Sequence, residues 1–360
     1  MSSSPRDVED MIFSVGGERI DPPTLVPAKL ILDLSGEAVR QRLCTFSDGE
    51  GGECSLRPDM TVPIAALVAQ GSRALARYVY SGTVWRLPRP GSGEAPEFSQ
   101  VGFEWFAGGG PEEDAEAFCL AMSAAYAGGE RSSSVRIGDV AVFASLLESL
   151  SLSQAWRARL LRSFARGGAR EALAPQAPPS ALATALAGLT AEQAKHAVEE
   201  IFAIAGTAST GQRSAADIAG RLRERAADPG PSAQAAAAIG EYLSIECPAD
   251  EASEALAGFA RSHGVTLGQA LSDFTRRQEA ISRRGPPFWP TARFSARDGW
   301  RFEYYDGFVF ELAAPETPDR PSVAGGRYDG LVGRLSGQAV VSQAIGAAVR
   351  LDRLEAGALS

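Results

Sequence analysis

The sequence predicts an α+β protein with a helical insertion in the middle of the chain. Residues 78–106 hold two runs of aromatic and β-branched side chains, which favour strands, separated by a turn rich in proline and glycine. Residues 143–284 are instead rich in Ala, Leu, Arg and Glu and have helical periodicity. We therefore predict one domain formed by residues 1–145 and 285–360, interrupted by an α-helical insertion over residues 146–284.

Composition narrows the classes of function. The 360 residues are 45% hydrophobic, which is enough to bury a sizeable core. The net charge of -9 gives no general attraction to phosphate backbones and argues against nucleic-acid binding. The four cysteines are scattered without a Cys-x-x-Cys pair and there are only two histidines, so we expect no disulfide framework and no metal site. No apolar run approaches the ~18 residues of a membrane span, and we expect a cytoplasmic protein.

The N-terminal segment predicts a helix and then a hairpin. Over residues 6–15, apolar side chains recur at the i, i+3, i+4, i+7 spacing of one helical face. These side chains are Val8, Met11, Ile12 and Val15. So short a helix is marginal alone, so its apolar face must pack on the core or on another subunit. Residues 46–56 predict a hairpin that turns at Asp48.

A second helix is predicted over residues 62–70, directly after two polar residues. Thr61 is placed to be its N-cap, and Pro63 falls in its first turn, where proline is tolerated. Asp59 lies near the same helix N-terminus. Two interpretations of Asp59 stay open, namely a capping residue and a residue that recognises an α-amino group.

The second strand of the central segment, residues 97–106, has two different faces because side chains alternate along a strand. One face is apolar and suits a core; its residues are Val101, Phe103 and Trp105. The other carries Gln100, Gly102 and Glu104. The glycine lets a ligand approach the backbone, and the two polar side chains can bind donors. The alternative interpretation is a face exposed to solvent.

Strand signals return near the C-terminus. Residues 302–305 and 308–312 flank Asp306-Gly307, which predicts a hairpin. The glycine-rich residues 325–330 lack the Gly-Lys-Ser/Thr of a P-loop. Residues 344–349 predict one further strand.

Taken in order, these segments resemble the class II aminoacyl-tRNA synthetases of the histidyl type over nearly the whole chain. The matching segments are residues 56–61, Trp85-Arg86 with residues 97–104, Tyr304-Tyr305 with residues 309–311, residues 325–331, and Arg353. The resemblance implies an antiparallel sheet flanked by helices and a dimer formed through the N-terminal helix and strand. It also implies a histidine pocket. In that pocket the α-amino group would meet Asp59, Thr61 and Gln100, and the imidazole would meet Glu104, Tyr305 and Tyr328.

Several positions depart from the synthetase pattern. Trp300 stands where the family has an arginine that stabilises charge during adenylation, and Arg350 stands where a glycine admits ATP. Arg86 is followed by Pro88 rather than by the usual motif, which leaves Arg86 and Arg353 as vestigial nucleotide-site arginines. The indole of Trp300 cannot neutralise the charge of a phosphate, and losing the arginine at this position costs about 10²–10³ in rate. Because the sequence stops soon after Arg353, we expect no counterpart of the anticodon-binding domain.

With these departures the chain resembles the regulatory-subunit family of ATP phosphoribosyltransferase. The resemblance implies a non-catalytic protein without a cofactor or tRNA. It would pair with a short-form catalytic subunit in a hetero-octamer at the first step of histidine biosynthesis. There it would be required for activity and for feedback by L-histidine. Two alternatives stay open, a divergent enzyme that adenylates an amino acid with Arg86 and Arg353, and a free-standing amino-acid sensor.

Overall fold

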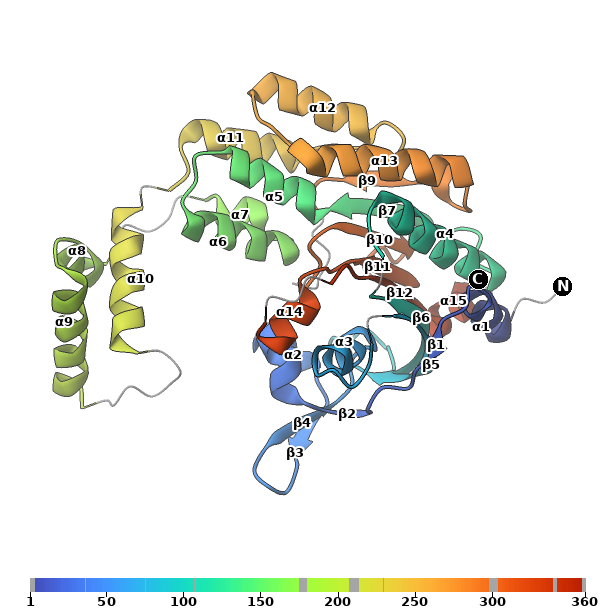
Figure 1. Cartoon of the computed structure of the whole chain (residues 1–360), viewed down its shortest axis with the longest axis horizontal. Helices are drawn as coiled ribbons and strands as arrows, with labels where there is room; N and C mark the ends of the chain where they lie inside the picture. Colours follow the sequence, from blue (N-terminus) through green and yellow to red (C-terminus); the bar gives the residue numbers. More distant parts are fainter. Residues whose placement is uncertain are drawn as a thin grey trace.

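The computed structural model contains a nine-stranded sheet, a small three-stranded sheet and helices on both faces of the larger sheet (Figure 1). It describes residues 4–35, 37–74, 76–106, 108–174, 180–206, 214–228, 230–297, 304–338 and 342–357. The order of the large sheet is β1-β5-β6-β12-β11-β10-β7-β9-β8. Its pairs are antiparallel except β1–β5 and β7–β9. The predicted α+β class is confirmed.

The strands of the large sheet come from both ends of the chain. In spatial order they are β1 (Glu18–Arg19), β5 (Arg77–Trp85), β6 (Glu97–Trp105), β12 (Ile345–Arg350), β11 (Val323–Arg327), β10 (Phe308–Ala313), β7 (Ser134–Asp139), β9 (Arg293–Ser295) and β8 (Glu246–Pro248). β6 and β12 are hydrogen-bonded neighbours in the interior of the sheet, so the predicted polar strand pairs with the predicted C-terminal strand. Both strands begin and end within one or two residues of the positions expected from sequence.

The small sheet has the order β2 (Leu25–Pro27), β4 (Glu53–Leu56), β3 (Thr45–Ser47). It is followed or flanked by α2 (Ala28–Ser35), the 3₁₀ helix η1 (Glu37–Arg42) and α3 (Thr61–Ala69). The predicted hairpin is confirmed. The carboxylate of Asp48 accepts hydrogen bonds from the amides of Glu50 (3.0 Å) and Gly52 (2.8 Å), which holds the turn between β3 and β4.

The N-terminal helix α1 (Pro5–Ser14) packs on α4 (Pro111–Ala127) and on the sheet. Val8 and Ile12 are fully buried there, as the helical spacing predicts. Val15 is 38% exposed, contrary to expectation, because the helix ends at Ser14. The last helix, α15 (Leu351–Gly357), follows β12 directly.

Two apolar clusters fill the two faces of the sheet. The first contains the predicted core residues Val101, Phe103 and Trp105, packed with α4 and with helices of the insertion. The second lies on the opposite face, with α3 and α14 (Leu331–Ser336), and includes a group of tyrosines. Gln100 and Glu104 point to this second face and are 4% and 1% exposed, so the solvent-facing alternative for this strand face is wrong.

The segment between β7 and β9 is mostly helical. Its helices are α5 (Val140–Ser149), α6 (Gln154–Ala165), α7 (Ala169–Ala172), α8 (Ala181–Ala187), α9 (Ala191–Ile204), α10 (Ala215–Ala227), α11 (Ala233–Tyr242), α12 (Ala252–His263) and α13 (Gly268–Arg284). The first three and last three of these share the large core of the sheet. Strand β8 also lies in this segment and pairs with β9, so the segment is not wholly helical. The division into two domains stays a prediction.

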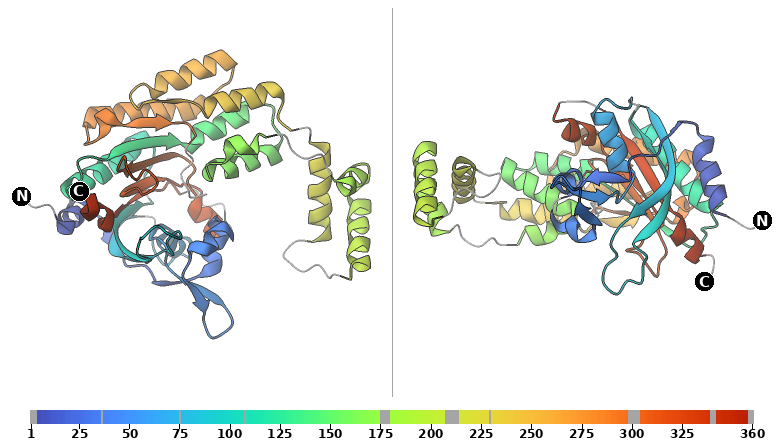
Figure 2. Two further views of the ribbon diagram at one scale, coloured as in Figure 1. Left: turned by 180° about the vertical axis from the view of Figure 1, so that it is seen from behind. Right: turned by 90° about the horizontal axis from the view of Figure 1, so that it is seen from below.

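Helices α8, α9 and α10 form a lobe that stands apart from the rest of the molecule, as Figures 1 and 2 show from three directions. The lobe has its own small apolar cluster, formed by Leu186, Ala194, Val198 and Ala219. By the scale of protein cores this is a very small one.

A buried ionic cluster ties α13 to the sheet. Arg277 of α13 donates to Asp114 of α4 (Nη1–Oδ2, 2.9 Å) and also pairs with Asp139 at the start of α5. Arg327 of β11 donates to the other oxygen of Asp114 (Nε–Oδ1, 2.7 Å). All four side chains are at most 9% exposed, so one carboxylate joins three elements that lie far apart in sequence.

The hairpin predicted around Asp306 is wrong in the part that the structure describes. β10 begins at Phe308, but Tyr304 and Tyr305 are not in a strand. The carboxylate of Asp306 accepts instead from the amides of Asp329 (2.9 Å) and Gly330 (2.7 Å), which ties this turn to the end of β11. Residues 302 and 303, and the departure at Trp300, lie outside the described residues.

Within the described ranges, no helix combines the length and apolar character that crossing a membrane requires. The cytoplasmic location stays a prediction.

Candidate functional site

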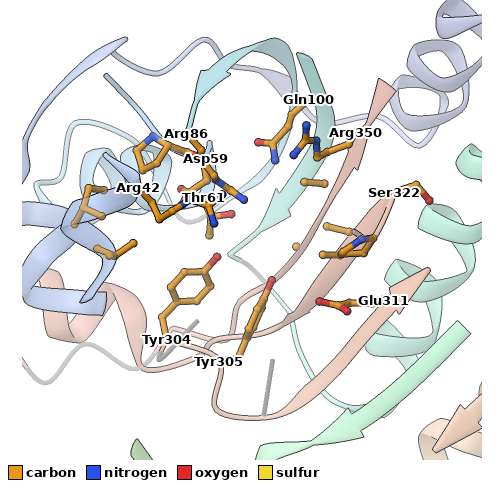
Figure 3. Close-up of a pocket in the computed structure, with 18 of the residues that line it drawn as sticks. Arg42, Asp59, Thr61, Arg86, Gln100, Tyr304, Tyr305, Glu311, Ser322 and Arg350 are labelled. Carbon is orange, nitrogen blue, oxygen red and sulfur yellow. The ribbon is translucent and has the colours of Figure 1, made fainter. Parts of the chain in front are cut away.

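A cavity of about 380 Å³ opens on the polar face of β6 and β12, between the large sheet, α3 and η1 (Figure 3). Its walls carry six arginines, although the chain as a whole is acidic. The charged residues that line it are Arg42, Asp59, Arg86, Arg89, Arg166, Glu311, Arg350 and Arg353. The cavity therefore combines a strongly cationic wall with two carboxylates.

Four of the six predicted histidine-pocket residues line this cavity, namely Asp59, Thr61, Gln100 and Tyr305. They come from the loop before α3, the start of α3, β6 and the loop before β10. Glu104 and Tyr328 lie beneath its wall instead; each is 1% exposed. The structure thus brings all six together, but in two layers.

Glu104 is the centre of the deeper layer. One of its oxygens, Oε1, accepts hydrogen bonds from the hydroxyls of Thr61 (2.6 Å) and Tyr80 (3.4 Å), and the other, Oε2, accepts from Tyr328. Gly346 of β12 makes room for the carboxyl, since a Cβ there would meet Oε2 at 1.8 Å. Burial raises the pKa of Glu104 to about 8, against the three hydroxyls that lower it. At neutral pH the group is therefore mainly an uncharged carboxylic acid.

Asp59 does what the capping interpretation predicts. Its Oδ1 accepts the amide hydrogen of Val62 at 3.0 Å, at the N-terminus of α3. Thr61 is therefore not the N-cap, contrary to expectation; it is the first residue of α3, and its hydroxyl is turned to Glu104. Burial raises the pKa of Asp59, and the positive charge of Arg86 and the Val62 amide oppose that shift. The capping role leaves the second oxygen of Asp59 to the cavity that the residue lines.

Gln100 lies next to the cationic wall. Its Oε1 is buried without a hydrogen-bond partner among the described residues, which is costly unless a ligand or solvent supplies a donor. Its direct cross-strand neighbour in β12 is Arg350, and the two side chains lie beside each other in Figure 3. An unsatisfied acceptor in a cavity wall is the expected sign of a binding site.

The two arginines predicted to be vestigial both line the cavity and make structural contacts. Arg86 donates to the carbonyl of Pro58 (Nε–O, 2.5 Å), and burial lowers its pKa. Arg353 pairs with Glu94 (Nη2–Oε1, 2.7 Å) and donates to the carbonyl of Pro321 (2.6 Å). Each guanidinium is thus held in place by the protein itself.

Arg350 is held differently. Its guanidinium carbon lies 3.5 Å from the centre of the Phe98 ring, a cation–π contact. Its Nε and Nη2 pair with the carboxylate of Asp352 at 3.1 and 2.6 Å. It lies in the cavity wall and covers the aromatic ring beneath it.

Sequence reasoning missed Arg42, Arg89, Arg166 and Glu311 as cavity residues. They come from η1, the turn between β5 and β6, the turn after α6, and β10. No spacing along the chain links them, and only the packing of the insertion against the core brings Arg166 to this place. The excess of arginine in an otherwise acidic protein was the one available signal.

Among the described residues, no three His, Cys, Asp or Glu side chains come together in a way that could hold a metal ion. The four cysteines form no disulfide. Burial raises the pKa of the Cys119 thiol to about 11, which leaves it unreactive at neutral pH.

The comparison with known proteins first shows to which class of fold the chain belongs. The family model of histidyl-tRNA synthetase matches residues 2–219 and 212–354. A structure from Bacillus halodurans, described as an ATP phosphoribosyltransferase regulatory subunit/histidyl-tRNA synthetase, superposes with a TM-score of 0.63 at 24% identity, over 97% of this chain and 76% of that one. Histidyl-tRNA synthetase from Nostoc superposes with a TM-score of 0.62 at 16% identity, over 100% of this chain and 73% of that one. The fold is therefore that of the class II, histidyl-type synthetases, as predicted.

Sequence relatives narrow the class. The chain is 33% identical to the ATP phosphoribosyltransferase regulatory subunit of Chelativorans sp. over 93% of its length and 91% of the relative. It is 34% identical to the protein of the same name from Mesorhizobium japonicum over 94% and 92%. The chain belongs to the family of ATP phosphoribosyltransferase regulatory subunits. The prediction of a regulatory rather than a catalytic protein is thereby confirmed.

Proposed function

We propose that this chain pairs with the short-form catalytic subunit of ATP phosphoribosyltransferase in a hetero-octamer. In that assembly it makes the catalytic subunit fully active at the first step of histidine biosynthesis and carries its feedback inhibition by histidine. The names of the relatives support the partnership. The resemblance to dimeric synthetases supports self-association through α1 and the first strand.

The cavity on β6 and β12 is the proposed site for L-histidine. Asp59, Thr61 and Gln100 take the α-amino group, and the buried Gln100 Oε1 is the observation that carries this assignment. The imidazole lies against Tyr305 and reaches the deeper layer, where it exchanges one hydroxyl contact of Glu104 for its own N–H. A neutral carboxylic acid in that layer also accommodates an uncharged imidazole without leaving a buried charge alone.

The stabilisation of the chain by histidine tests the site. At ~100-fold excess over its dissociation constant, histidine should raise the free energy of unfolding by ~2.7 kcal/mol. Identical melting curves with and without histidine would refute the proposed site.

Activity of the reconstituted complex tests the partnership. Mixing the chain with a short-form catalytic subunit should raise phosphoribosyl transfer, and histidine should then inhibit it. A catalytic subunit that is equally active and equally inhibited without this chain would refute the proposed role. Co-purification of the two chains would at the same time exclude a free-standing sensor.

The alternative of an adenylating enzyme rests on Arg86 and Arg353. Both make contacts with the protein, Arg353 with Glu94 and Arg86 with a carbonyl, which supports a structural role for them. Histidine-dependent exchange of pyrophosphate into ATP would favour the enzyme; we expect none.

A further inference from the structure

We infer that Arg350 is a specificity-determining residue that binds the α-carboxylate of a free amino acid in the cavity. This inference rests on the proposed histidine site and adds one requirement to it. The ligand must carry an unmodified carboxylate, so that amides, esters and decarboxylated amines are rejected.

The position of Arg350 in the sheet supports this assignment. Arg350 and Gln100 are direct partners across β12 and β6, and side chains of such partners lie on the same face about 4.5–5.5 Å apart at Cβ. The amino and carboxylate groups of an amino acid are attached to one carbon atom. A ligand whose amino group is bound by Gln100 therefore places its carboxylate within reach of the neighbouring side chain, and that side chain is a guanidinium (Figure 3).

The contacts of Arg350 hold its guanidinium in place but leave some of its N–H donors available. Stacking on Phe98 at 3.5 Å fixes the plane of the group, and Asp352 takes the hydrogens of Nε and one of Nη2. An arginine has five N–H donors, so this pairing leaves donors for a second acceptor. Asp352 is 44% exposed, and solvent screens an ion pair of this kind. The partner of Arg350 therefore competes weakly with a carboxylate inside the cavity.

The other two arginines near this end of the cavity are less suited to the task. Arg353 pairs with Glu94, whose side chain is 19% exposed, and also donates to a backbone carbonyl. Arg86 donates to the Pro58 carbonyl and lies close enough to Asp59 to feel its charge. Together, the Asp59 side and the Arg350 side of the cavity present opposite charges to the two ends of a zwitterion, which is how complementary sites gain specificity.

The competing interpretation is that Arg350 only covers Phe98 and pairs with Asp352. The two roles differ in ligand preference, because a purely structural arginine would not change the preference for a carboxylate. We therefore propose to measure the affinity of the full-length chain by titration calorimetry for three probes. These are L-histidine, L-histidinamide and histamine, which share the imidazole and the amino group.

The wild-type chain should prefer histidine over histidinamide and histamine by about 10- to 100-fold, the range for a charge-assisted hydrogen bond. Arg350→Met should weaken the binding of histidine by a similar factor and leave the affinity for histamine nearly unchanged, so that the preference for histidine disappears. Arg350→Lys should restore part of it, because the charge returns without the planar fork.

Arg77→Met is the matched control. Arg77 also stacks on an aromatic ring, Trp105 at 4.1 Å, and pairs with a carboxylate, Glu116 at 2.9 Å, but it lies outside the cavity lining. This control should keep the preference for histidine.

Each result decides between the two claims. Equal affinities of the wild-type chain for histidine and histamine would overturn the role of Arg350 while leaving the histidine site intact. Failure of all three probes to bind would overturn the proposed site itself. If Arg350→Met does not fold, the wild-type preference and the Arg350→Lys variant still decide.

Discussion

The buried Glu104 makes a quantitative prediction about stability and pH. Its pKa in the folded chain is about 8, raised from an ordinary value of 4.5 mainly by burial. The folded state therefore favours the protonated carboxyl, and the stability that this proton contributes is fully present below the unfolded pKa. It is lost as pH rises toward the folded pKa, at about 1.4 kcal/mol per pH unit. Above about pH 8 no further loss is expected from this group.

The variant Glu104→Gln isolates this contribution. A glutamine side chain has the same shape and stays neutral at every pH, while it still accepts from Thr61 and can donate toward Tyr328. The stability of the wild type relative to the variant should therefore fall by about 2 kcal/mol between about pH 6 and pH 7.5. Asp306, whose pKa burial raises to about 6, titrates in both proteins and cancels in the difference.

Urea unfolding followed by tryptophan fluorescence at several pH values measures this difference. Parallel pH profiles for the two proteins would mean that Glu104 is ionised throughout, and would refute the description of the deeper layer as an uncharged acid held by hydroxyls. A second consequence concerns histidine. If its N–H replaces one hydroxyl donor of Glu104, the contact becomes charge-assisted when the acid ionises, so this contact should not weaken as pH rises through about 8.

Three further predictions concern other parts of the structure. Asp114→Asn leaves Arg277 and Arg327 buried without their shared carboxylate, and should cost about 3–5 kcal/mol in urea unfolding; a loss under ~1 kcal/mol would contradict the picture. Gly346→Ala places a Cβ 1.8 Å from the buried acid and should abolish the histidine-induced rise in melting temperature. Gly240→Ala, where nothing lies within 4 Å, should keep that rise; equal behaviour of the two variants would count against the site. Amide hydrogen exchange should be faster in α8–α10 than in β5 and β6, because the small cluster of the lobe stabilises it little, and uniform protection would show the lobe to be part of the main cooperative unit.

Alternation along a strand is enough to predict which residues of β6 share a face. It cannot predict that the polar face is buried, because burial depends on distant segments. Glu104 meets Tyr80, 24 residues away, and Tyr328, 224 residues away, and neither contact follows from local pattern. The resemblance to the synthetases supplied Tyr328 but not Tyr80, and the structure adds that Glu104 and Tyr328 lie in a layer below the cavity.

The errors have local physical causes. Thr61 is expected to cap α3 because its type and place fit a cap, but it is already the first residue of the helix and its hydroxyl donates to Glu104, while Asp59 accepts the Val62 amide hydrogen. The hairpin at Asp306 was expected because Asp-Gly favours tight turns, yet the Asp306 carboxylate binds two amides at the end of β11. In both cases a side chain that can hydrogen-bond in several ways was assigned the commonest partner.

Strand β8 has a practical consequence for anyone who wishes to shorten this protein. It lies within the long helical segment, yet it completes the large sheet by pairing with β9. Excising residues 146–284 as a cassette would remove it, bare the hydrogen-bonding groups of β9 and invite strand-to-strand aggregation. Deleting only residues 180–228 would keep the pairing of β8 with β9, so this smaller deletion should give a shortened protein that stays monodisperse.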